Sequence, residues 1–174
     1  MLSHIITPAE SILRDFPEMT TRLHANRLVH YQQSLQWVEL KTAKDIAPLF
    51  SAFRATKHRA GVSLANPFAR PLRIGELVNR FDQMNSETRS PFEAMRNHFL
   101  EHGVPATLEL PAYAVGPGQY FLLDGNHRAA GLYLVGADVS LRLRVLNAPI
   151  DRRFLIDLKY WDGGWRRFLH RSQK

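Results

Sequence analysis

Hydrophobic and polar residues alternate along several short stretches in the second half of the chain, which is the pattern of half-buried β-strands. This pattern predicts strands over Leu108–Val115 and Tyr120–Leu123, joined by a turn with the sequence Gly-Pro-Gly-Gln. A third strand is expected over Val139–Val145, where apolar residues alternate with polar ones that include Arg142 and Arg144. This third strand is therefore predicted to have a basic outer face.

Helical signals begin at the N-terminus. Thr7 and Glu10 have the spacing of a capping box, which predicts a helix that runs to about Asp15. Apolar residues between Met19 and Gln36 follow an irregular helical stripe. We therefore expect a helical N-terminal extension over residues 1–36.

The next stretch combines a short strand, a helix and a loop. Trp37–Leu40 is predicted to be the strand, and Thr42 with Asp45 predicts a capped helix that continues to about Lys57. Residues 58–73 contain three Gly or Pro residues and no periodicity, so we expect a long basic loop there. A loop of that length inside a compact domain is typical of a functional segment.

Two further helical signals precede the predicted hairpin. The pattern of residues 72–81 fits a strand and a helix equally well. Ser90 and Glu93 form a second capping-box pattern, which predicts a helix that ends at Gly103. The order of elements predicts an α+β fold with a small mixed sheet flanked by helices. We divide the chain into the extension at 1–36, a core at 37–149 and a basic aromatic segment at 150–174.

Composition excludes several classes of protein. The chain of 174 residues is 45% hydrophobic, which is typical of a folded domain. It has no cysteine, so disulfides, thiol catalysis and cysteine-bound zinc are excluded. No apolar run is long enough to span a membrane, and the N-terminus lacks the features of a secretory signal. We therefore expect a cytoplasmic protein.

Charge points to a polyanionic partner. The chain has 23 Lys and Arg against 16 Asp and Glu, a net charge of +7. The excess is concentrated in residues 46–75, which contain no acid, and in residues 151–174, where basic and aromatic residues are interleaved. The aromatic residues of the second segment fit equally well a surface that stacks on nucleic-acid bases and an element that packs on the core. We expect largely non-sequence-specific DNA binding, with these candidate contacts: Arg54, Lys57, Arg59, Arg70, Arg142, Arg144, Arg166 and Arg167.

The stretch after Leu123 is the strongest candidate for a functional site. An apolar strand stops at Asp124-Gly125, and a helix rich in small residues follows until Gly136. Free N–H groups and the helix dipole favour an anion at such a turn, and Arg128 adds a planar guanidinium suited to phosphate. The turn therefore predicts a phosphate site formed by four residues, Gly125, Asn126, His127 and Arg128.

The sequence Asp-Gly-Asn-His-Arg at 124–128 resembles the phosphate-binding motif of the ParB/sulfiredoxin superfamily. It is most similar to the D-G-H-H-R form of the free-serine kinases of that superfamily, with Asn126 in place of the first His. Sulfiredoxins have cysteine in G-C-H-R where this chain has Asn126, which excludes sulfinic-acid reduction. The resemblance covers about residues 73–146 and implies the ParB/sulfiredoxin-like fold.

Hydrolysis at such a site needs a group that orients water, and positive charge on the phosphates. His127 and Arg128 are candidates for the charge, while the acids Asp124, Glu87, Glu93 and Glu39 are candidates for the first role. Asp124 is also the candidate ligand for Mg²⁺. The resemblance to the serine kinases implies an acid on the segment before the helix, which is near Glu87.

Three functions agree with these observations. The first is an ATP-type nucleotide hydrolase that binds DNA and cleaves it, as ParB-like nucleases do. The superfamily also includes plasmid-encoded inhibitors of conjugation, so the resemblance implies a protein partner in the DNA transfer machinery as well. The second is a free-serine-type kinase, which the motif favours. The third is a non-enzymatic, nucleotide-gated DNA adaptor.

Overall fold

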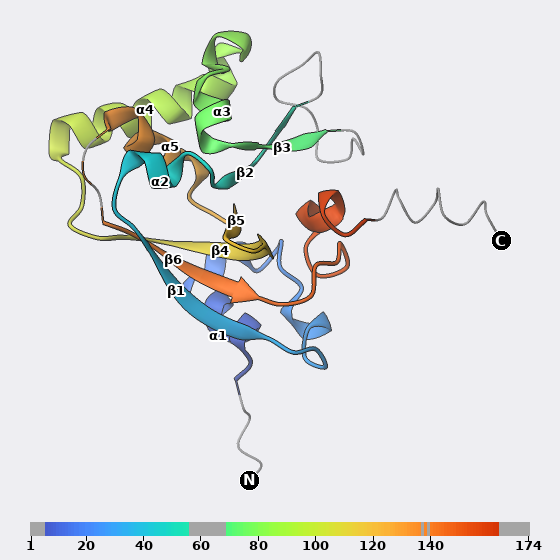
Figure 1. The fold of residues 1–174 in the computed structure, drawn as a ribbon. Helices are drawn as coiled ribbons and strands as arrows, with labels where there is room; N and C mark the ends of the chain where they lie inside the picture. Colours follow the sequence, from blue (N-terminus) through green and yellow to red (C-terminus); the bar gives the residue numbers. More distant parts are fainter. Residues whose placement is uncertain (1–5, 56–68, 137, 139, 164–174) are drawn as a thin grey trace.

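The computed structural model describes residues 6–55, 69–136, 138 and 140–163, and its centre is one mixed β-sheet. The strands of this six-stranded sheet lie in the order β1-β6-β4-β5-β2-β3 (Figure 1). Their bounds are Ser34–Leu40 (β1), Phe50–Ala55 (β2), Arg70–Arg73 (β3), Leu108–Gly116 (β4), Gln119–Leu122 (β5) and Leu141–Asn147 (β6).

Neighbouring strands pair in both directions. β6 lies between β1, which is antiparallel to it, and β4, which is parallel. β4 and β5 form the predicted antiparallel hairpin, and β5 is parallel to β2. Leu141, Leu143 and Val145 of β6 are buried while Arg142 and Arg144 are half-buried, which confirms the predicted alternation. The structure thus confirms an α+β fold with a mixed sheet and an N-terminal helix.

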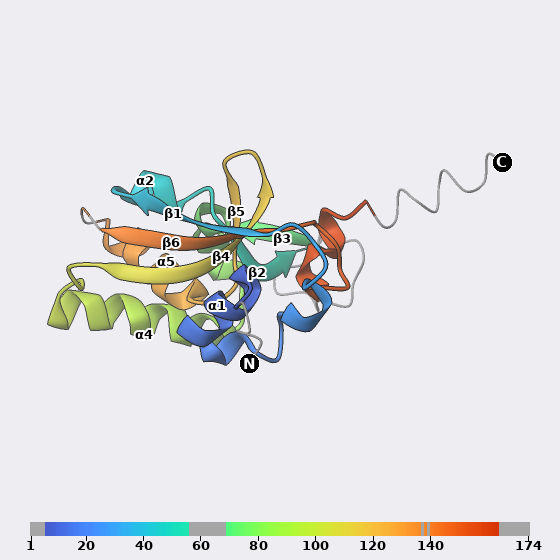
Figure 2. The ribbon, with the colours of Figure 1, turned by 90° about the horizontal axis from the view of Figure 1, so that it is seen from below.

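Helices cover one face of the sheet. Figure 1 shows α2, α3, α4 and α5 on one side of the strands and α1 on the other. Figure 2 shows the same layers from a perpendicular direction, with α5 between α4 and the strands. The bounds are Pro8–Asp15 (α1), Ala43–Ile46 (α2), Ile74–Val78 (α3), Ser86–His102 (α4) and Asn126–Val135 (α5).

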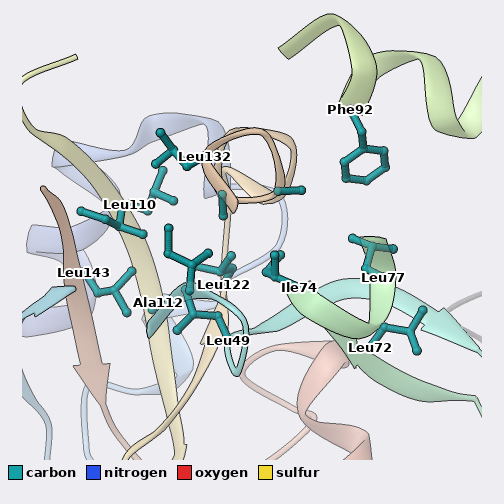
Figure 3. Close-up of a cluster of buried hydrophobic side chains, with 14 of the residues drawn as sticks. Leu49, Leu72, Ile74, Leu77, Phe92, Leu110, Ala112, Leu122, Leu132 and Leu143 are labelled. Atoms are coloured by element: carbon teal, nitrogen blue, oxygen red, sulfur yellow. The ribbon is translucent and has the colours of Figure 1, made fainter. Parts of the chain in front are cut away.

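Each face of the sheet has its own hydrophobic cluster. The cluster under α2–α5 contains Leu110, Leu122, Leu132 and Leu143, which Figure 3 shows together between the helices and strands. The opposite cluster is covered by the segments before β1 and after β6, which contribute buried residues from α1, from the 19–28 region and from the 154–158 region. The described segments before β1 and after β6 therefore help to close the core.

Two predicted helices need correction: the one predicted from Thr42 begins with its capping box but ends at Ile46, and the one predicted over residues 19–36 is absent. Residues 50–55 form β2, because Pro48 has no N–H to continue α2 and because these residues pair with β3 and β5 inside the sheet. Residues 17–36 contain two short 3-10 turns, Pro17–Met19 and Ala25–Arg27, and then the start of β1. Their apolar residues are buried because the chain lies along the sheet face, so the stripe was not evidence of a continuous helix.

Other boundaries shift or are confirmed. α1 begins with the predicted capping box, and α4 ends at Gly103 as predicted. The predicted start of α4 is wrong. Asn85, not Ser90, is the N-cap of this helix and accepts a hydrogen bond of 2.8 Å from the backbone N–H of Thr88. The ambiguous segment 72–81 contains the end of β3 and all of α3.

The described part of the C-terminal segment packs on the core. Phe154, Leu155 and Leu158 are buried, and the ring of Trp161 lies 5.1 Å from that of Phe50. These residues therefore pack on the core and do not form a surface that stacks on nucleic-acid bases. A short 3-10 helix spans Ile156–Tyr160. Among the described residues, no helix is long and apolar enough to cross a membrane.

Candidate functional site

The predicted turn lies where β5 ends and α5 begins. Gly125 has a φ of 77°, in the left-handed region that favours glycine. A Cβ atom at this position would lie 2.3 Å from Cδ2 of Leu110, which belongs to the neighbouring strand β4. Gly125 is thus required both by the backbone angle and by the close approach of Leu110, and this confirms the predicted break between strand and helix.

The N-terminus of α5 differs from those of α1 and α4. Thr7 caps α1 and Asn85 caps α4 through side-chain oxygens. No side-chain hydrogen bond among the described residues caps α5, whose N-cap is Gly125. The first N–H groups of a helix have no partner within the helix, and the helix dipole makes this end positive. The turn therefore has the properties of an anion site.

Arg128 and Asp124 form an ion pair one turn apart. A guanidinium nitrogen of Arg128 donates a hydrogen bond of 2.6 Å to the carboxylate of Asp124, and about a third of each side chain is exposed, 34% and 37%. The predicted guanidinium is therefore at the turn and reachable from solvent. Its charge is neutralised by Asp124 in this structure.

His127 lies among aromatic rings. Its imidazole is 4.4 Å from the ring of Phe92 in α4 and 5.7 Å from that of Phe53 in β2, measured between centroids. Burial lowers the pKa of His127, and the negative charge of Asp124 opposes this shift only in part. At neutral pH the ring is uncharged, so it offers one donor and one acceptor and no fixed positive charge.

Asn126 has a structural role in addition to its predicted one. Its side-chain oxygen accepts a hydrogen bond of 3.0 Å from the backbone N–H of Ala52 and ties the first turn of α5 to β2. The side chain is buried with 9% exposure. The amide oxygen is therefore engaged inside the protein, so any contact with an anion would come from the side-chain NH2 group or the backbone N–H of Asn126.

The other candidate acids lie elsewhere. Glu87 is exposed in the first turn of α4, where the helix dipole stabilises its negative charge. Glu93 pairs with Arg89 at 3.0 Å, and Glu39 lies on β1, 3.9 Å from Arg142. No hydrogen bond or ion pair in the described part of the chain joins Glu87, Glu93 or Glu39 to the turn.

Arg54 is not a surface residue. Its side chain has no exposure, and its guanidinium donates to the backbone oxygen of Asp157 at 2.8 Å and lies 3.4 Å from the carboxylate. Burial lowers the pKa of Arg54, an effect that Asp157 opposes. The predicted contact between Arg54 and DNA phosphates is wrong for this arrangement, because the charge is used inside the protein.

Three other predicted DNA contacts are paired with acids. Arg70 makes a two-pronged pair with Glu76 at 2.9 and 3.0 Å. Arg142 contacts Glu109 at 3.2 Å, and Arg144 contacts Asp15 at 2.9 Å. The basic face of β6 is thus largely neutralised. The remaining candidates, Lys57, Arg59, Arg166 and Arg167, lie outside the described residues.

A metal ion would find a single carboxylate at the turn. The described residues contain no group of three or more His, Asp or Glu side chains that could hold a metal ion. Asp124 fits a Mg²⁺ ion that takes one protein carboxylate and completes its shell with substrate phosphates and water. The carboxylate of Asp124 is partly exposed and beside the anion site, which agrees with that kind of binding.

Sequence reasoning missed the groups that surround the turn. Phe53, Phe92 and Leu110 contact its residues from three other elements, and Arg22 donates to the carbonyl oxygen of Leu123 directly before it. Their spacing in the chain contains no signal for these contacts.

No protein-family model matches the chain, and neither the curated proteins nor the solved structures include a match.

Proposed function

We propose that the protein binds a nucleoside triphosphate, ATP in the first instance, at the turn between β5 and α5, hydrolyses it and binds DNA. The observation that carries the proposal is the uncapped N-terminus of α5 beside the partly exposed guanidinium of Arg128. Backbone N–H groups and a planar guanidinium together suit phosphate oxygens. The resemblance of residues 124–128 to the ParB/sulfiredoxin motif supports the same assignment.

The residues at the turn have complementary roles in this proposal. Arg128 exchanges Asp124 for a phosphate and stabilises the charge that develops during transfer. The uncharged imidazole of His127 orients water or moves a proton. Asp124 would hold a Mg²⁺ ion, which would supply further neutralisation of phosphate charge.

DNA binding is assigned to residues outside this turn. The net charge of +7 supports a polyanionic partner, although the described arginines Arg54, Arg70, Arg142 and Arg144 are paired with acids. The proposed contacts are therefore Lys57, Arg59, Arg166 and Arg167. Binding that depends on backbone phosphates is non-sequence-specific and falls steeply with salt. Action as a ParB-like nuclease on plasmid or conjugative DNA is the corresponding biological proposal.

A free-serine-type kinase is the second candidate. The observation in its favour is the motif, in which only Asn126 departs from the kinase form D-G-H-H-R. A kinase would transfer phosphate from ATP to serine, whereas the proposed hydrolase releases it to water. Parallel assays of phosphate release and of serine phosphorylation distinguish the two candidates.

The first test measures nucleotide and DNA affinity on the same variants. Arg128→Ala removes a charge-assisted contact worth about 1.5–3 kcal/mol, so ATP affinity should fall roughly ten- to a hundredfold. Arg128→Lys should recover only part of it, because an ammonium group cannot make two parallel bonds. Arg152→Ala is the matched control, since Arg152 also pairs with an aspartate at 2.6 Å but belongs to the segment after β6 and not to the turn.

Variants of the proposed DNA contacts should have the opposite effect, on DNA binding and not on ATP turnover. Replacing Arg166 and Arg167 by Ala should weaken DNA binding and leave ATP turnover without DNA nearly unchanged. If Arg128→Ala instead loses DNA binding as severely as ATP binding, the turn is a clamp for DNA phosphates and the hydrolase proposal is wrong.

A second test identifies the acid that assists hydrolysis. Asp124→Asn and His127→Gln should each lower turnover by roughly a hundredfold or more, as expected for groups that position metal, water or protons. Glu87→Gln and Glu93→Gln are the comparison variants, and turnover should be nearly unchanged because neither carboxylate contacts the turn. A large loss in Glu87→Gln alone would favour the kinase-like arrangement.

A further inference from the structure

A groove opens directly beside the proposed phosphate site. It lies between the C-terminal half of α4, the start of β4 and the side chain of Arg128, and it has a volume of about 460 Å³. Pockets for small molecules are typically about 300–1,000 Å³. Arg128 therefore belongs both to the turn and to the wall of a groove large enough for a further part of a ligand.

The walls of this groove are mostly apolar. They are formed by side chains from α4, from the turn after it and from β4: Met95, Phe99, Val104 and Leu108. The chain also turns at Gly103, where a Cβ atom would meet nothing within 4 Å, so the backbone leaves open space at this end. Such walls favour a flat, weakly polar group over a second phosphate or a sugar alone.

Two stacked imidazoles complete the wall. His98 and His102 are one turn apart on α4, and their rings lie 4.7 Å apart and nearly parallel, at 25°. Both side chains belong to exposed residues, so neither is held in the hydrophobic core. A π-surface of this kind is suited to stacking on a heteroaromatic ring.

The described lining contains a guanidinium group and no carboxylate. The described residues that line the groove include Arg128 and two histidines but no aspartate or glutamate. The carboxylate of Asp124 is engaged with Arg128 at 2.6 Å. A ligand with an aromatic ring at one end and negative charge at the other would match both the apolar walls and the guanidinium.

We infer that the groove binds the base of the nucleotide whose phosphates lie at the β5–α5 turn, with the ring against His98 and His102 and with Arg128 between the two parts. This inference rests on the proposed function and adds a site for the base to it. The groove then gives the protein affinity for a nucleotide beyond its affinity for phosphate alone.

The test compares ATP with inorganic tripolyphosphate, which has the phosphates but no base. Calorimetric titration of the full chain should show that ATP binds roughly tenfold or more tightly than tripolyphosphate, since stacking of one base is a substantial contribution. The double variant His98→Ala/His102→Ala should lose most of that difference and bind tripolyphosphate as the original protein does. Arg128→Ala should weaken the binding of both ligands.

A control variant separates the groove from general charge effects. His102→Glu places a carboxylate in the groove and should weaken ATP binding, whereas His30→Glu makes the same change at an exposed histidine elsewhere and should not. Histidine C–H signals in NMR spectra provide a second readout. Those of His98 and His102 should shift on addition of ATP, and that of His30 should stay in place.

The outcomes distinguish this inference from the proposed function. If the double variant binds ATP as tightly as the original protein, or if ATP and tripolyphosphate bind equally, the base does not occupy the groove, and the phosphate site stands alone. If neither ligand binds the original protein, the proposed function fails and this inference fails with it.

Discussion

Two arginine–aspartate pairs illustrate how environment changes the role of the same chemistry. Arg128 lies in the first turn of α5 and Asp124 lies just before this helix, and about a third of each side chain is exposed. Arg54 and Asp157 come from β2 and from the segment after β6, and neither side chain is exposed. The first pair is in contact with solvent beside the proposed phosphate site, and the second is enclosed in the protein interior.

The difference determines which pair can exchange partners. A solvent-exposed ion pair contributes little to stability, so a phosphate can replace Asp124 at Arg128 at small cost. Removal of one member of a buried pair leaves an uncompensated charge without water. The exposed pair is therefore suited to ligand binding, whereas the buried pair is suited to holding the structure together.

The buried pair is also connected to the turn through Arg22. Asp157 accepts a second hydrogen bond of 2.8 Å from Arg22, and Arg22 donates to the carbonyl oxygen of Leu123. Leu123 directly precedes Asp124. The N-terminal segment, the C-terminal segment and β2 thus meet at the end of the strand from which the turn emerges.

The largest expected effect breaks the buried pair. Asp157→Asn should lower the free energy of unfolding by about 3–5 kcal/mol, because Arg54 and Arg22 lose their common partner. Asp124→Asn is the matched variant and should cost only about 0.2–1 kcal/mol. Urea denaturation measures both. Similar losses in the two variants would contradict the distinction between the pairs.

The second effect concerns the backbone of the turn. Gly125→Ala should cost about 2–4 kcal/mol, from the positive φ and from displacement of Leu110. Gly118→Ala, in the hairpin between β4 and β5, has a φ of 64° but no atom within 4 Å of the added Cβ. It should cost only about 1–2 kcal/mol in thermal or urea unfolding. An equal cost at both positions would show that Leu110 moves aside freely.

The third effect is a pH dependence from His127. Its pKa is lowered by burial in the folded state, so the unfolded chain binds the proton first as the pH falls below about 6.5. Stability should therefore decrease from neutral pH towards the folded pKa, and less so in His127→Phe, which keeps a ring against Phe53 and Phe92. Unfolding curves at pH 7 and pH 5 test this. A difference between the proteins that does not change with pH would refute it.

The smallest effect is the coupling within the exposed pair. A double-mutant cycle with Asp124→Asn and Arg128→Gln should give about 0.3–0.5 kcal/mol, as for other helical pairs of this spacing. High salt should reduce it, because solvent ions screen exposed charges. A coupling of several kcal/mol that persists at high salt would place this pair in the same class as the buried one.

The local part of the candidate site could be predicted from the sequence. The strand that ends before Asp124, the turn at Gly125 and the helix end at Gly136 depend on neighbouring residues in the chain. The same is true of the capping box at Thr7 and of the alternation in β6. Such features need no knowledge of which distant elements become neighbours, since propensity and pattern determine them within a few residues.

Tertiary structure alone determined the rest. Residues 50–55 are a strand because they lie between β5 and β3, and Arg54 is consequently buried beside Asp157, which is more than a hundred positions away in the chain. Asn126 bonds to Ala52, and His127 lies against Phe53 and Phe92, for the same reason. Sheet order and helix packing bring these residues together, and a single chain's local pattern contains no information about which remote surfaces will meet to exclude water.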